Sequence, residues 1–280
     1  IYYPSKVSVE QTSSEKTARY KSDLITGKSL LDLSGGFGVD DYYFAQRFQN
    51  VTHCEIDNDL SKIVQHNFEQ LGVSNIECIS GNSEAILENL NTSFDWLYVD
   101  PSRRNETKGK VFMLKDCLPN VPEQLDFYFR FSSNIMIKTA PILDITAGLS
   151  ELQNVKAIHI VALENEVKEL LWMIEKDWSG NPKITAVNLT KDKTATFTFE
   201  WNSVAIAEYS EPKTYLYEPN AAIMKSGGFD WISAQYKLKK LHPHSHLYTS
   251  ERLMEFPGRV FTIDQVIPYN KTEMKLLANQ

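Results

Sequence analysis

Residues 30–45, LLDLSGGFGVDDYYFA, run from an apolar segment through a glycine loop into a helical pattern. Gly35, Gly36 and Gly38 lie in that loop, where glycine adopts dihedral angles that other residues resist and lets the backbone approach a ligand closely. The helix start just beyond the loop adds backbone N–H groups that have no partner within the helix. The stretch therefore predicts a strand, a ligand-binding loop and a helix in succession.

Short apolar strands alternate with helical patterns from Ser29 onward. We expect strands at 29–34, 51–57, 75–80, 94–100, 134–140 and 155–163, and helices at 39–48, 59–71, 83–90, 110–118, 142–151 and 165–176. Alternation with short links predicts an α/β fold, in which a doubly wound, mostly parallel sheet is covered by helices on both faces. Residues 183–190 and 194–201 predict an antiparallel hairpin at the edge of that sheet.

The chain divides into four expected parts. Residues 1–28 form an N-terminal helical segment, with Ser13 or Ser14 as its cap, and residues 29–207 hold the sheet. The character changes after this, so residues 208–264 are expected to form a small α+β domain. Residues 265–280 are expected to begin a further domain that continues beyond the sequence.

Composition restricts the classes of function. The formal net charge of −7 argues against a wholly basic nucleic-acid-binding surface, although it leaves room for a local basic patch. No apolar run approaches the roughly 18 residues that cross a bilayer, and the start of the chain is not a signal peptide. Cys54, Cys78 and Cys117 have no paired spacing, which indicates reduced thiols. A cytoplasmic protein without membrane contact is expected.

The glycine loop has two competing interpretations as a ligand site. A dinucleotide fingerprint requires a third glycine where this chain has Asp41. The alternative is the loop of class I S-adenosylmethionine (SAM) methyltransferases, Asp-x-Gly-x-Gly-x-Gly, which the chain resembles because Gly36 and Gly38 follow Asp32 by four and six residues. Ser34 replaces the first glycine of that pattern. A glycine-rich turn without a ligand also remains open.

The ends of the next two strands supply further candidates. Glu55 and Asp57 follow the second strand, where a carboxylate can bind ribose hydroxyls, and Glu55 is preferred. The other interpretation is a charge at a helix N-terminus. After the third strand, Asn82 replaces the acid that accepts from the adenine amino group in the methyltransferases that this chain resembles. An amide oxygen can accept the same bond, and Ser83 is a second candidate. Both residues also suit a helix cap.

The fourth strand ends in DPSRR, residues 100–104. In methyltransferases that modify nitrogen, an acid and a proline at this place hold the amine, so the resemblance implies that Asp100 and Pro101 hold the acceptor. Ser102 and Arg103 stand where that motif has a second proline and an aromatic residue. Arg103 and Arg104 are expected to contact substrate by gripping phosphate or by stacking. The alternative is that Asp100 caps the loop and the arginines lie in water.

Several segments together resemble one bacterial family. DLSGGFGVD, VDPSRR, EPNAAIMKSGGFD and KLHPHSHLYTS are similar to bacterial methyltransferase-like proteins that carry a ferredoxin-like and a THUMP-like domain, and more distantly to trimethylguanosine synthase. The resemblance implies a seven-stranded Rossmann-like methyltransferase sheet at 29–207. It also implies a ferredoxin-like domain at 208–264 and the start of a truncated THUMP-like domain at 265–280.

The same resemblance implies a function. SAM would be the cofactor, with Asp32, Ser34, Gly35, Gly36 and Gly38 at its methionine end, and an RNA nucleobase nitrogen would be the acceptor. THUMP domains belong to RNA-modifying enzymes, so the RNA partner rests on analogy. Two alternatives remain: a non-catalytic RNA- or protein-binding module on this fold, and a methyltransferase acting on a small molecule or protein.

A row of histidines remains outside this scheme. His242, His244 and His246 would share one face of a strand, and three imidazoles can bind zinc. No cysteine or carboxylate accompanies them at a recognised spacing. We therefore expect no metal site.

Overall fold

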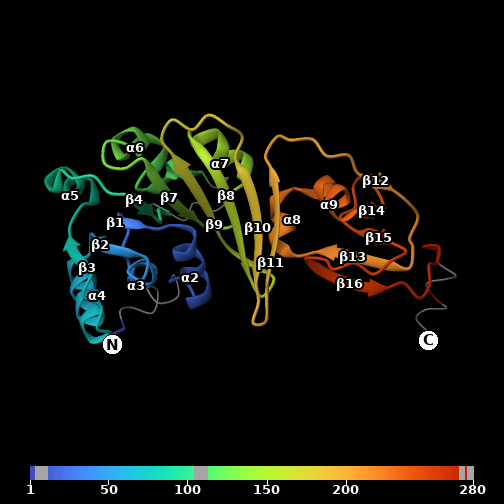
Figure 1. Ribbon diagram of the computed structural model, residues 1–280, viewed down its shortest axis with the longest axis horizontal. Helices are drawn as coiled ribbons and strands as arrows, with labels where there is room; N and C mark the ends of the chain where they lie inside the picture. Colours follow the sequence, from blue (N-terminus) through green and yellow to red (C-terminus); the bar gives the residue numbers. More distant parts are fainter. Residues whose placement is uncertain (4–11, 104–112, 271–274, 276–280) are drawn as a thin grey trace.

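A nine-stranded sheet dominates the computed structural model, which describes residues 1–3, 12–103, 113–270 and 275. With elements labelled as in Figure 1, the strand order in this described part is β11-β10-β8-β9-β7-β4-β1-β2-β3. The strands are β1 (Gly27–Asp32), β2 (Phe48–Glu55), β3 (Ile76–Ser80), β4 (Trp96–Val99), β7 (Asn134–Thr139), β8 (Val155–Leu163), β9 (Glu166–Glu175), β10 (Lys183–Leu189) and β11 (Thr194–Glu200).

The sheet is mostly parallel, as predicted, but it is larger than seven strands. β9 and β11 run against their neighbours, whereas β3, β2, β1, β4 and β7 pair in parallel, and so do β8 and β10. The extra strands come from the predicted hairpin of β10 and β11, which extends the sheet because β10 pairs along its whole length with β8.

The helix predicted at 165–176 is wrong, because this segment is strand β9. Glu164 and Asn165 both have positive φ, 48° and 65°, and form the tight turn of a β8–β9 hairpin. Residues 170–172, LLW, are all fully buried, so both faces of the strand are covered. A central strand of this kind is a continuous apolar run, which sequence periodicity does not separate from a helix.

The helix predicted at 110–118 is also absent from the part of that range that the structure describes. Residues 113–118 instead contain a single 3₁₀ turn, η1 (Leu114–Asp116), and strand β6 (Cys117–Leu118). β6 pairs antiparallel with β5 (Ser102–Arg103) and forms a short ribbon beside the main sheet. A helix that the sequence pattern did not indicate, α6 (Val121–Tyr128), follows the ribbon.

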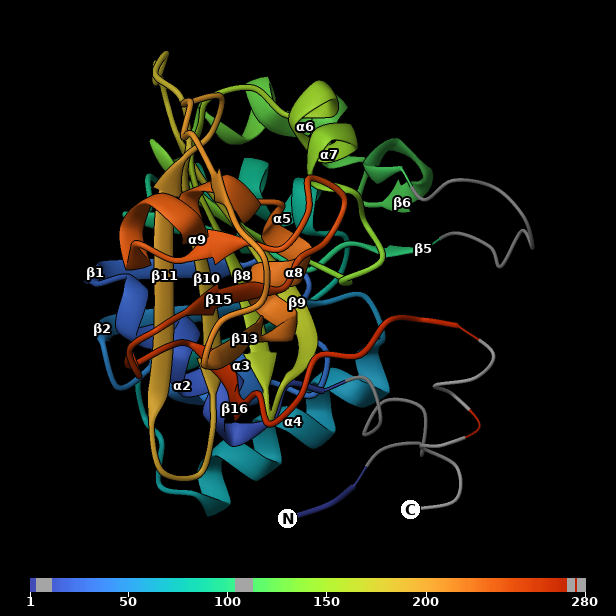
Figure 2. The same cartoon turned by 90° about the vertical axis from the view of Figure 1, so that its right-hand side faces the viewer.

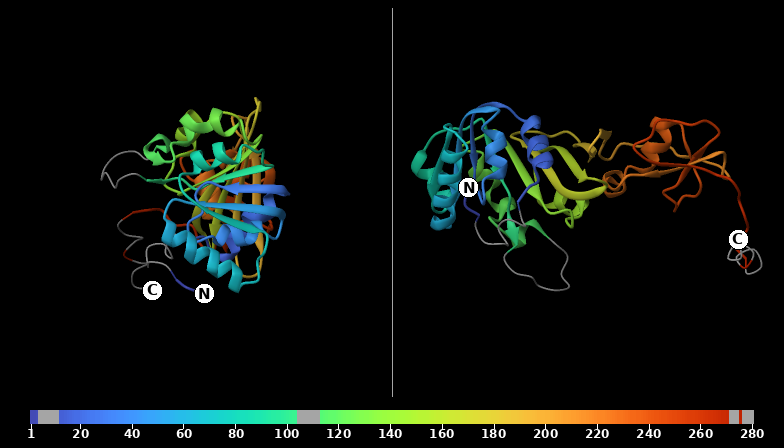
Figure 3. Two further views of the ribbon diagram at one scale, coloured as in Figure 1. Left: turned by 90° about the vertical axis from the view of Figure 1, so that its left-hand side faces the viewer. Right: turned by 90° about the horizontal axis from the view of Figure 1, so that it is seen from below.

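Helices cover both faces of the sheet (Figure 1, Figure 3). α2 (Glu15–Leu24), α3 (Val39–Phe44) and α4 (Asn58–Gln70) cover one face, and α5 (Ser83–Leu90), α6 and α7 (Ile145–Glu151) cover the other. Ser14, one of the two predicted caps, is the N-cap of α2 and accepts a hydrogen bond from the Thr17 N–H at 3.2 Å. Among the described residues, no helix has the length and hydrophobicity needed to cross a bilayer.

A second sheet lies beyond the β10–β11 edge (Figure 2). Its order is β12-β14-β15-β13-β16, and helices α8 (Ala221–Ser226) and α9 (Phe229–Tyr236) accompany it. The strands are β12 (Glu208–Tyr209), β13 (Tyr215–Pro219), β14 (Lys239–Lys240), β15 (Tyr248–Ser250) and β16 (Gly258–Thr262). Ala222 and Ile223 of α8 belong to the same buried apolar cluster as Ile184 and Ala186 of β10. The two sheets therefore share one hydrophobic core.

The protein should become less stable as the pH decreases, because of His159 in β8. The Nδ1 of His159 lies 2.7 Å from the Tyr20 hydroxyl of α2, and burial, followed by the charge of Lys183, lowers the pKa of His159 from 6.5 to about 4. Between pH 6.5 and about pH 4, the His159 side chain therefore binds a proton in the unfolded chain but not in the folded chain. We expect this residue alone to reduce the free energy of unfolding by about 2 kcal/mol between pH 7 and pH 5.

Urea unfolding of the wild type and of His159→Gln at both pH values measures this contribution. The wild type should lose more stability than the variant over that interval. Equal losses in the two proteins would show that His159 is not responsible.

Candidate functional site

A cavity of about 550 Å³ opens at the carboxyl ends of β1 to β4, the edge at which open α/β sheets bind ligands. Of the site residues predicted from the sequence, it brings together Asp32, Ser34, Gly35, Gly36, Gly38, Glu55, Asn82, Ser83, Asp100 and Ser102. Pro101 is buried next to Asp100 but is not among the lining residues. Arg103 is described only as part of β5, and Arg104 lies outside the described residues.

The glycine loop needs glycine at two positions for different reasons. Gly36 has φ of +54°, and a Cβ there would have only the Ser34 carbonyl oxygen nearby, at 3.7 Å. Gly35 is packed so closely on the His53 ring that a Cβ would lie 2.1 Å from it. The loop therefore presents its backbone to the cavity at Gly36 and rests on a buried histidine at Gly35.

Glu55 connects the end of β2 to the glycine loop. Its Oε2 accepts from the Gly36 N–H at 2.9 Å, and its Oε1 accepts from the Asp57 N–H at 2.8 Å. Asp57 instead caps α4 by accepting from two backbone N–H groups, so of the two carboxylates Glu55 alone lines the cavity. Ile56, which the sequence did not single out, also lines it and is 75% exposed. In the sequence, the signal for this position was an isoleucine between two acidic residues at the end of a strand.

Asn82 is an N-cap at the cavity rim. Its Oδ1 accepts from the Ala85 N–H at 2.9 Å at the start of α5, and Ser83 is the first residue of that helix. The capping interpretation of Asn82 is therefore observed. Its position in the cavity wall leaves the side chain within reach of a ligand.

Ser34, which stands where the methyltransferase loop pattern has its first glycine, links the ends of β1 and β4 through hydrogen bonds. Asp32 Oδ1 accepts from the Ser34 N–H at 2.7 Å and from its hydroxyl at 3.0 Å. The Ser34 Oγ in turn accepts from the Asp100 N–H at 2.6 Å. Burial, followed by the charge of Asp41, raises the pKa of Asp32. Replacement of the glycine by serine thus fixes the spacing between the loop and Asp100.

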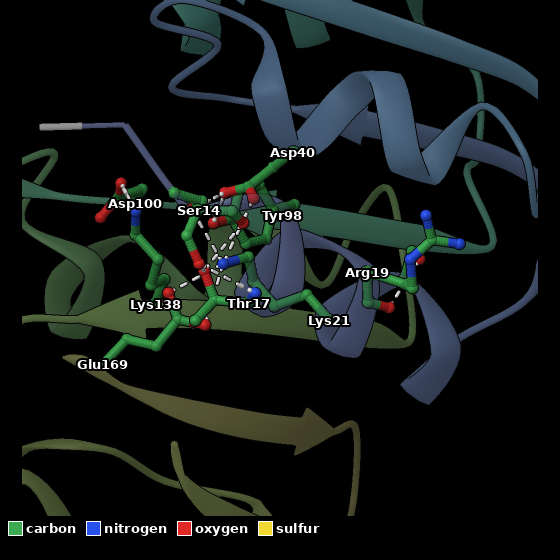
Figure 4. Close-up of polar contacts among 11 residues, drawn as sticks. Ser14, Thr17, Arg19, Lys21, Asp40, Tyr98, Asp100, Lys138 and Glu169 are labelled. Atoms are coloured by element: carbon green, nitrogen blue, oxygen red, sulfur yellow. Dashed lines mark hydrogen bonds and ion pairs between the residues drawn. The ribbon is translucent and has the colours of Figure 1, made fainter. Parts of the chain in front are cut away.

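A group of buried charges that the sequence did not reveal adjoins the cavity, because its members Asp40 and Lys138 also line the cavity (Figure 4). Lys21 of α2 is fully buried, and its Nζ donates to both carboxylate oxygens of Glu169, at 2.9 and 2.8 Å. The same Nζ is 3.2 Å from Asp40 Oδ1. Asp40 Oδ2 accepts from the hydroxyls of Tyr98, at 2.7 Å, and Ser13, at 3.0 Å.

The pKa shifts of these carboxylates differ in direction. Burial acts to raise the pKa of Asp40, but Lys21 and Lys138 outweigh it and hold that pKa below its ordinary value. Burial raises the pKa of Glu169 despite its contact with Lys21. Asp40 is therefore the more firmly anionic of the two, and it lies directly after the glycine loop.

Asp100 has a partner that the sequence did not predict. The Nζ of Lys138, near the end of β7, lies 2.5 Å from Asp100 Oδ2, and both residues line the cavity. Burial acts to lower the pKa of Lys138, but the carboxylates of Asp100, Asp40 and Glu169 outweigh it and raise that pKa. With Lys21, the cluster holds two cations and three carboxylates, so it has one carboxylate in excess.

The histidine row has structural contacts instead of a shared site. His246 stacks on Phe229, with ring centroids 3.6 Å apart, whereas the rings of His242 and His244 are 5.4 Å apart. Lys240 beside them is buried and pairs with Asp230 at 3.0 Å. In the described ranges, no group of histidine, cysteine and acidic side chains could hold a metal ion.

Comparison with known proteins places the chain in a family. A family model described as a ferredoxin-like domain matches residues 215–257, and no curated protein matches the sequence. A crystal structure of a protein from Porphyromonas gingivalis W83, classed as a methyltransferase, is 31% identical with a TM-score of 0.90. The match covers 99% of this chain and 71% of that protein. The chain belongs to the family of this P. gingivalis methyltransferase. Family membership extends over both sheets, because the match spans almost the whole chain.

More distant solved structures include an rRNA methylase from Streptococcus thermophilus, 15% identical with a TM-score of 0.41 over 57% of this chain and 94% of that one. TrmK from M. capricolum, solved in complex with S-adenosyl-homocysteine, is 17% identical with a TM-score of 0.44 over 58% of this chain and 68% of that one.

The buried charge cluster gives a stability prediction. Lys21→Met leaves Glu169 buried without its cation, so the free energy of unfolding should fall by about 3–5 kcal/mol. Lys21→Met/Glu169→Met removes both charges, and we expect it to recover at least half of that loss. Urea denaturation measures all of these values.

Lys16→Met is the matched control, because Lys16 lies in the same helix and pairs with Glu164 at the surface. It should cost less than about 1 kcal/mol. A loss in Lys21→Met no larger than in this control would contradict a stabilising role for the buried pair.

Proposed function

We propose that this protein is a SAM-dependent methyltransferase and that the cavity at the ends of β1 to β4 binds the cofactor. The observation that carries the proposal is the convergence of the glycine loop, Glu55 and Asp100 on one cavity. It is supported by the match over 99% of this chain and 71% of a protein classed as a methyltransferase. The three features come from separate strands, so their meeting is not a consequence of closeness in the sequence.

The lining residues fit the three parts of this cofactor. Glu55 suits the ribose hydroxyls, and Asn82 and Ser83 suit the adenine, with Ile56 as an apolar surface beside it. The glycine loop suits the methionine end of the cofactor, and its lining residues are Asp32, Ser34, Gly35, Gly36 and Gly38. The excess carboxylate of the buried cluster favours a ligand with a positive centre. When bound, SAM supplies a methyl group on a positively charged sulfur.

Asp100 and Pro101 hold the methyl acceptor. The Asp100 carboxylate accepts a hydrogen bond from the acceptor's N–H and so directs the nitrogen lone pair toward the methyl group. As the nitrogen bonds to the methyl carbon it loses a proton, and Asp100 is placed to receive it. The hydrogen bond from the Asp100 N–H to Ser34 Oγ keeps this carboxylate at a fixed position relative to the loop.

The acceptor is a nitrogen of an RNA nucleobase, with Ser102, Arg103 and Arg104 as substrate contacts. Ser102 lines the cavity beside Asp100, which supports substrate contact by the start of this segment. In the second domain, Lys239 and Lys240 are paired with Glu208 and Asp230. The basic stretch KLKKLHPHSH, residues 237–246, therefore has two of its lysines paired with acids, which favours RNA contact near the cavity over contact along this stretch. The motifs shared with THUMP-containing proteins support the RNA assignment.

Calorimetric titration of SAM and S-adenosylhomocysteine tests the cofactor site. The Gly36→Ala change puts a Cβ at a backbone φ of +54° on the wall of the cavity, and we expect at least tenfold weaker binding of both compounds. The control is Gly72→Ala, with φ of +70° and no atom within 4 Å of the new Cβ.

The control imposes the same backbone strain away from the cavity, and its affinity should match that of the wild type. Failure of the folded wild type to bind either compound would overturn the proposed function. It would favour a non-catalytic binding module.

Transfer of radiolabelled methyl groups tests Asp100. Asp100→Asn, assayed with total bacterial RNA, should lose at least a hundredfold in transfer rate, because the amide no longer takes a proton. Its affinity for S-adenosylhomocysteine should stay within threefold of wild type.

Asp59→Asn, at an exposed position in α4, serves as the control and should transfer normally. Undiminished transfer by Asp100→Asn would exclude the assigned role. Labelling of protein or small molecules instead of RNA would reassign the acceptor.

A further inference from the structure

The acceptor side of the cavity contains a cation that the proposed function leaves unused. Lys138 lies one residue before the end of β7, its side chain is 12% exposed, and it lines the cavity beside Asp100 (Figure 4). Among the described residues, Asp100 is its one ion-pair partner, and the contact involves Oδ2. An ammonium group has three N–H donors. At least one donor therefore remains for a ligand in the cavity.

Lys138 stays charged in this setting. The pKa of its ammonium is raised because three carboxylates outweigh burial. A buried N–H group without an acceptor costs free energy, which a ligand carbonyl or ring nitrogen would recover. The carboxylate of Asp100 has the complementary property, since its Oδ1 has no ion-pair partner in the described part of the chain. One acceptor and one donor thus lie side by side.

An apolar wall stands next to this pair. Leu118 of β6 is 53% exposed, lines the cavity, and is paired in register with Ser102 of β5. Pro119 follows it in the same wall. The sequence motif lacks an aromatic residue after Asp100, where Arg103 stands instead. Leu118 and Pro119 supply an apolar surface close to that place, against which a flat ring can pack.

We propose that Asp100 and Lys138 act together to recognise the methyl acceptor as a cyclic amide or amidine. The Asp100 carboxylate accepts from the ring or exocyclic N–H, and the Lys138 ammonium donates to the neighbouring carbonyl oxygen or unprotonated ring nitrogen. The ring lies against Leu118 and Pro119. This inference rests on the proposed function, and it assigns to Lys138 a selective role among possible nitrogen acceptors.

The experiment uses small heterocycles as probes in saturation-transfer NMR, with the protein loaded with S-adenosylhomocysteine. The probes are 9-methylguanine, 1-methyluracil, 1-methylcytosine, 9-methyladenine and 9-methylpurine, of which the last has no N–H group. In the wild type, at least one of the first four should bind five times more tightly than 9-methylpurine. Lys138→Met should weaken the binding of that probe at least tenfold, and its affinity for S-adenosylhomocysteine should stay within threefold of that of the wild type.

Lys156→Met is the matched control, since Lys156 of β8 pairs with Glu175 at the surface of the same sheet. Its probe affinity should equal that of the wild type. The comparison of probes in the wild type also tests the proposal without any variant, which covers the case in which Lys138→Met fails to fold.

The outcomes separate the two levels of inference. If the wild type does not bind S-adenosylhomocysteine, the proposed function fails. If it binds, but 9-methylpurine matches the best of the other probes or Lys138→Met leaves the probe affinity unchanged, the role of Lys138 fails alone. Loss of S-adenosylhomocysteine affinity in Lys138→Met, with probe binding unchanged, would assign the lysine to the cofactor and overturn the proposal.

Discussion

The ammonium group of Lys21 is fully buried, and its anions come from two elements that are distant in the sequence, Glu169 in β9 and Asp40 in α3. A buried cation is tolerated only where such partners surround it. α2 must therefore lie against β9, and α3 must begin where Asp40 reaches Lys21. Since α3 starts directly after the glycine loop, one ion cluster fixes the N-terminal helix, the sheet and the loop together.

The cavity beside that cluster combines backbone and side-chain control. The loop is shaped by positive φ at Gly36 and by the packing of Gly35 on His53, while Glu55 and Ser34 hold it to β2 and β4. These contacts fix the position of the loop, whereas the buried charge cluster sets the electrostatic potential in the cavity. The result is a loop held in place by contacts within the protein, so the loop loses little conformational entropy when a ligand binds.

Local patterns singled out the residues at strand ends that line this cavity. The loop, Glu55, Asn82 and Asp100 stand at strand ends, where residue type and spacing carry information. The burial of Lys21 and Lys138 could not be predicted in this way. The sequence alone does not distinguish a buried lysine from an exposed one, and the acidic partners are far away in the chain. The error at 165–176 has a related cause. The run of Leu, Leu and Trp there is buried on both faces by strands and helices that the sequence does not place beside it.

The position of β9 has a consequence for the order of assembly during synthesis. β7 and β8 are consecutive strands of this sheet in the chain, yet β9 lies between them and pairs with both. A ribosome that has released residues up to Leu163 has exposed the glycine loop, Lys21 and Lys138, but not the strand that joins β7 to β8. Glu169 arrives with β9, after both lysines. Until β9 inserts, Lys21 and Lys138 have Asp40 and Asp100 as their carboxylate partners, so the cluster gains its third carboxylate in the same event in which β7 and β8 gain the strand between them.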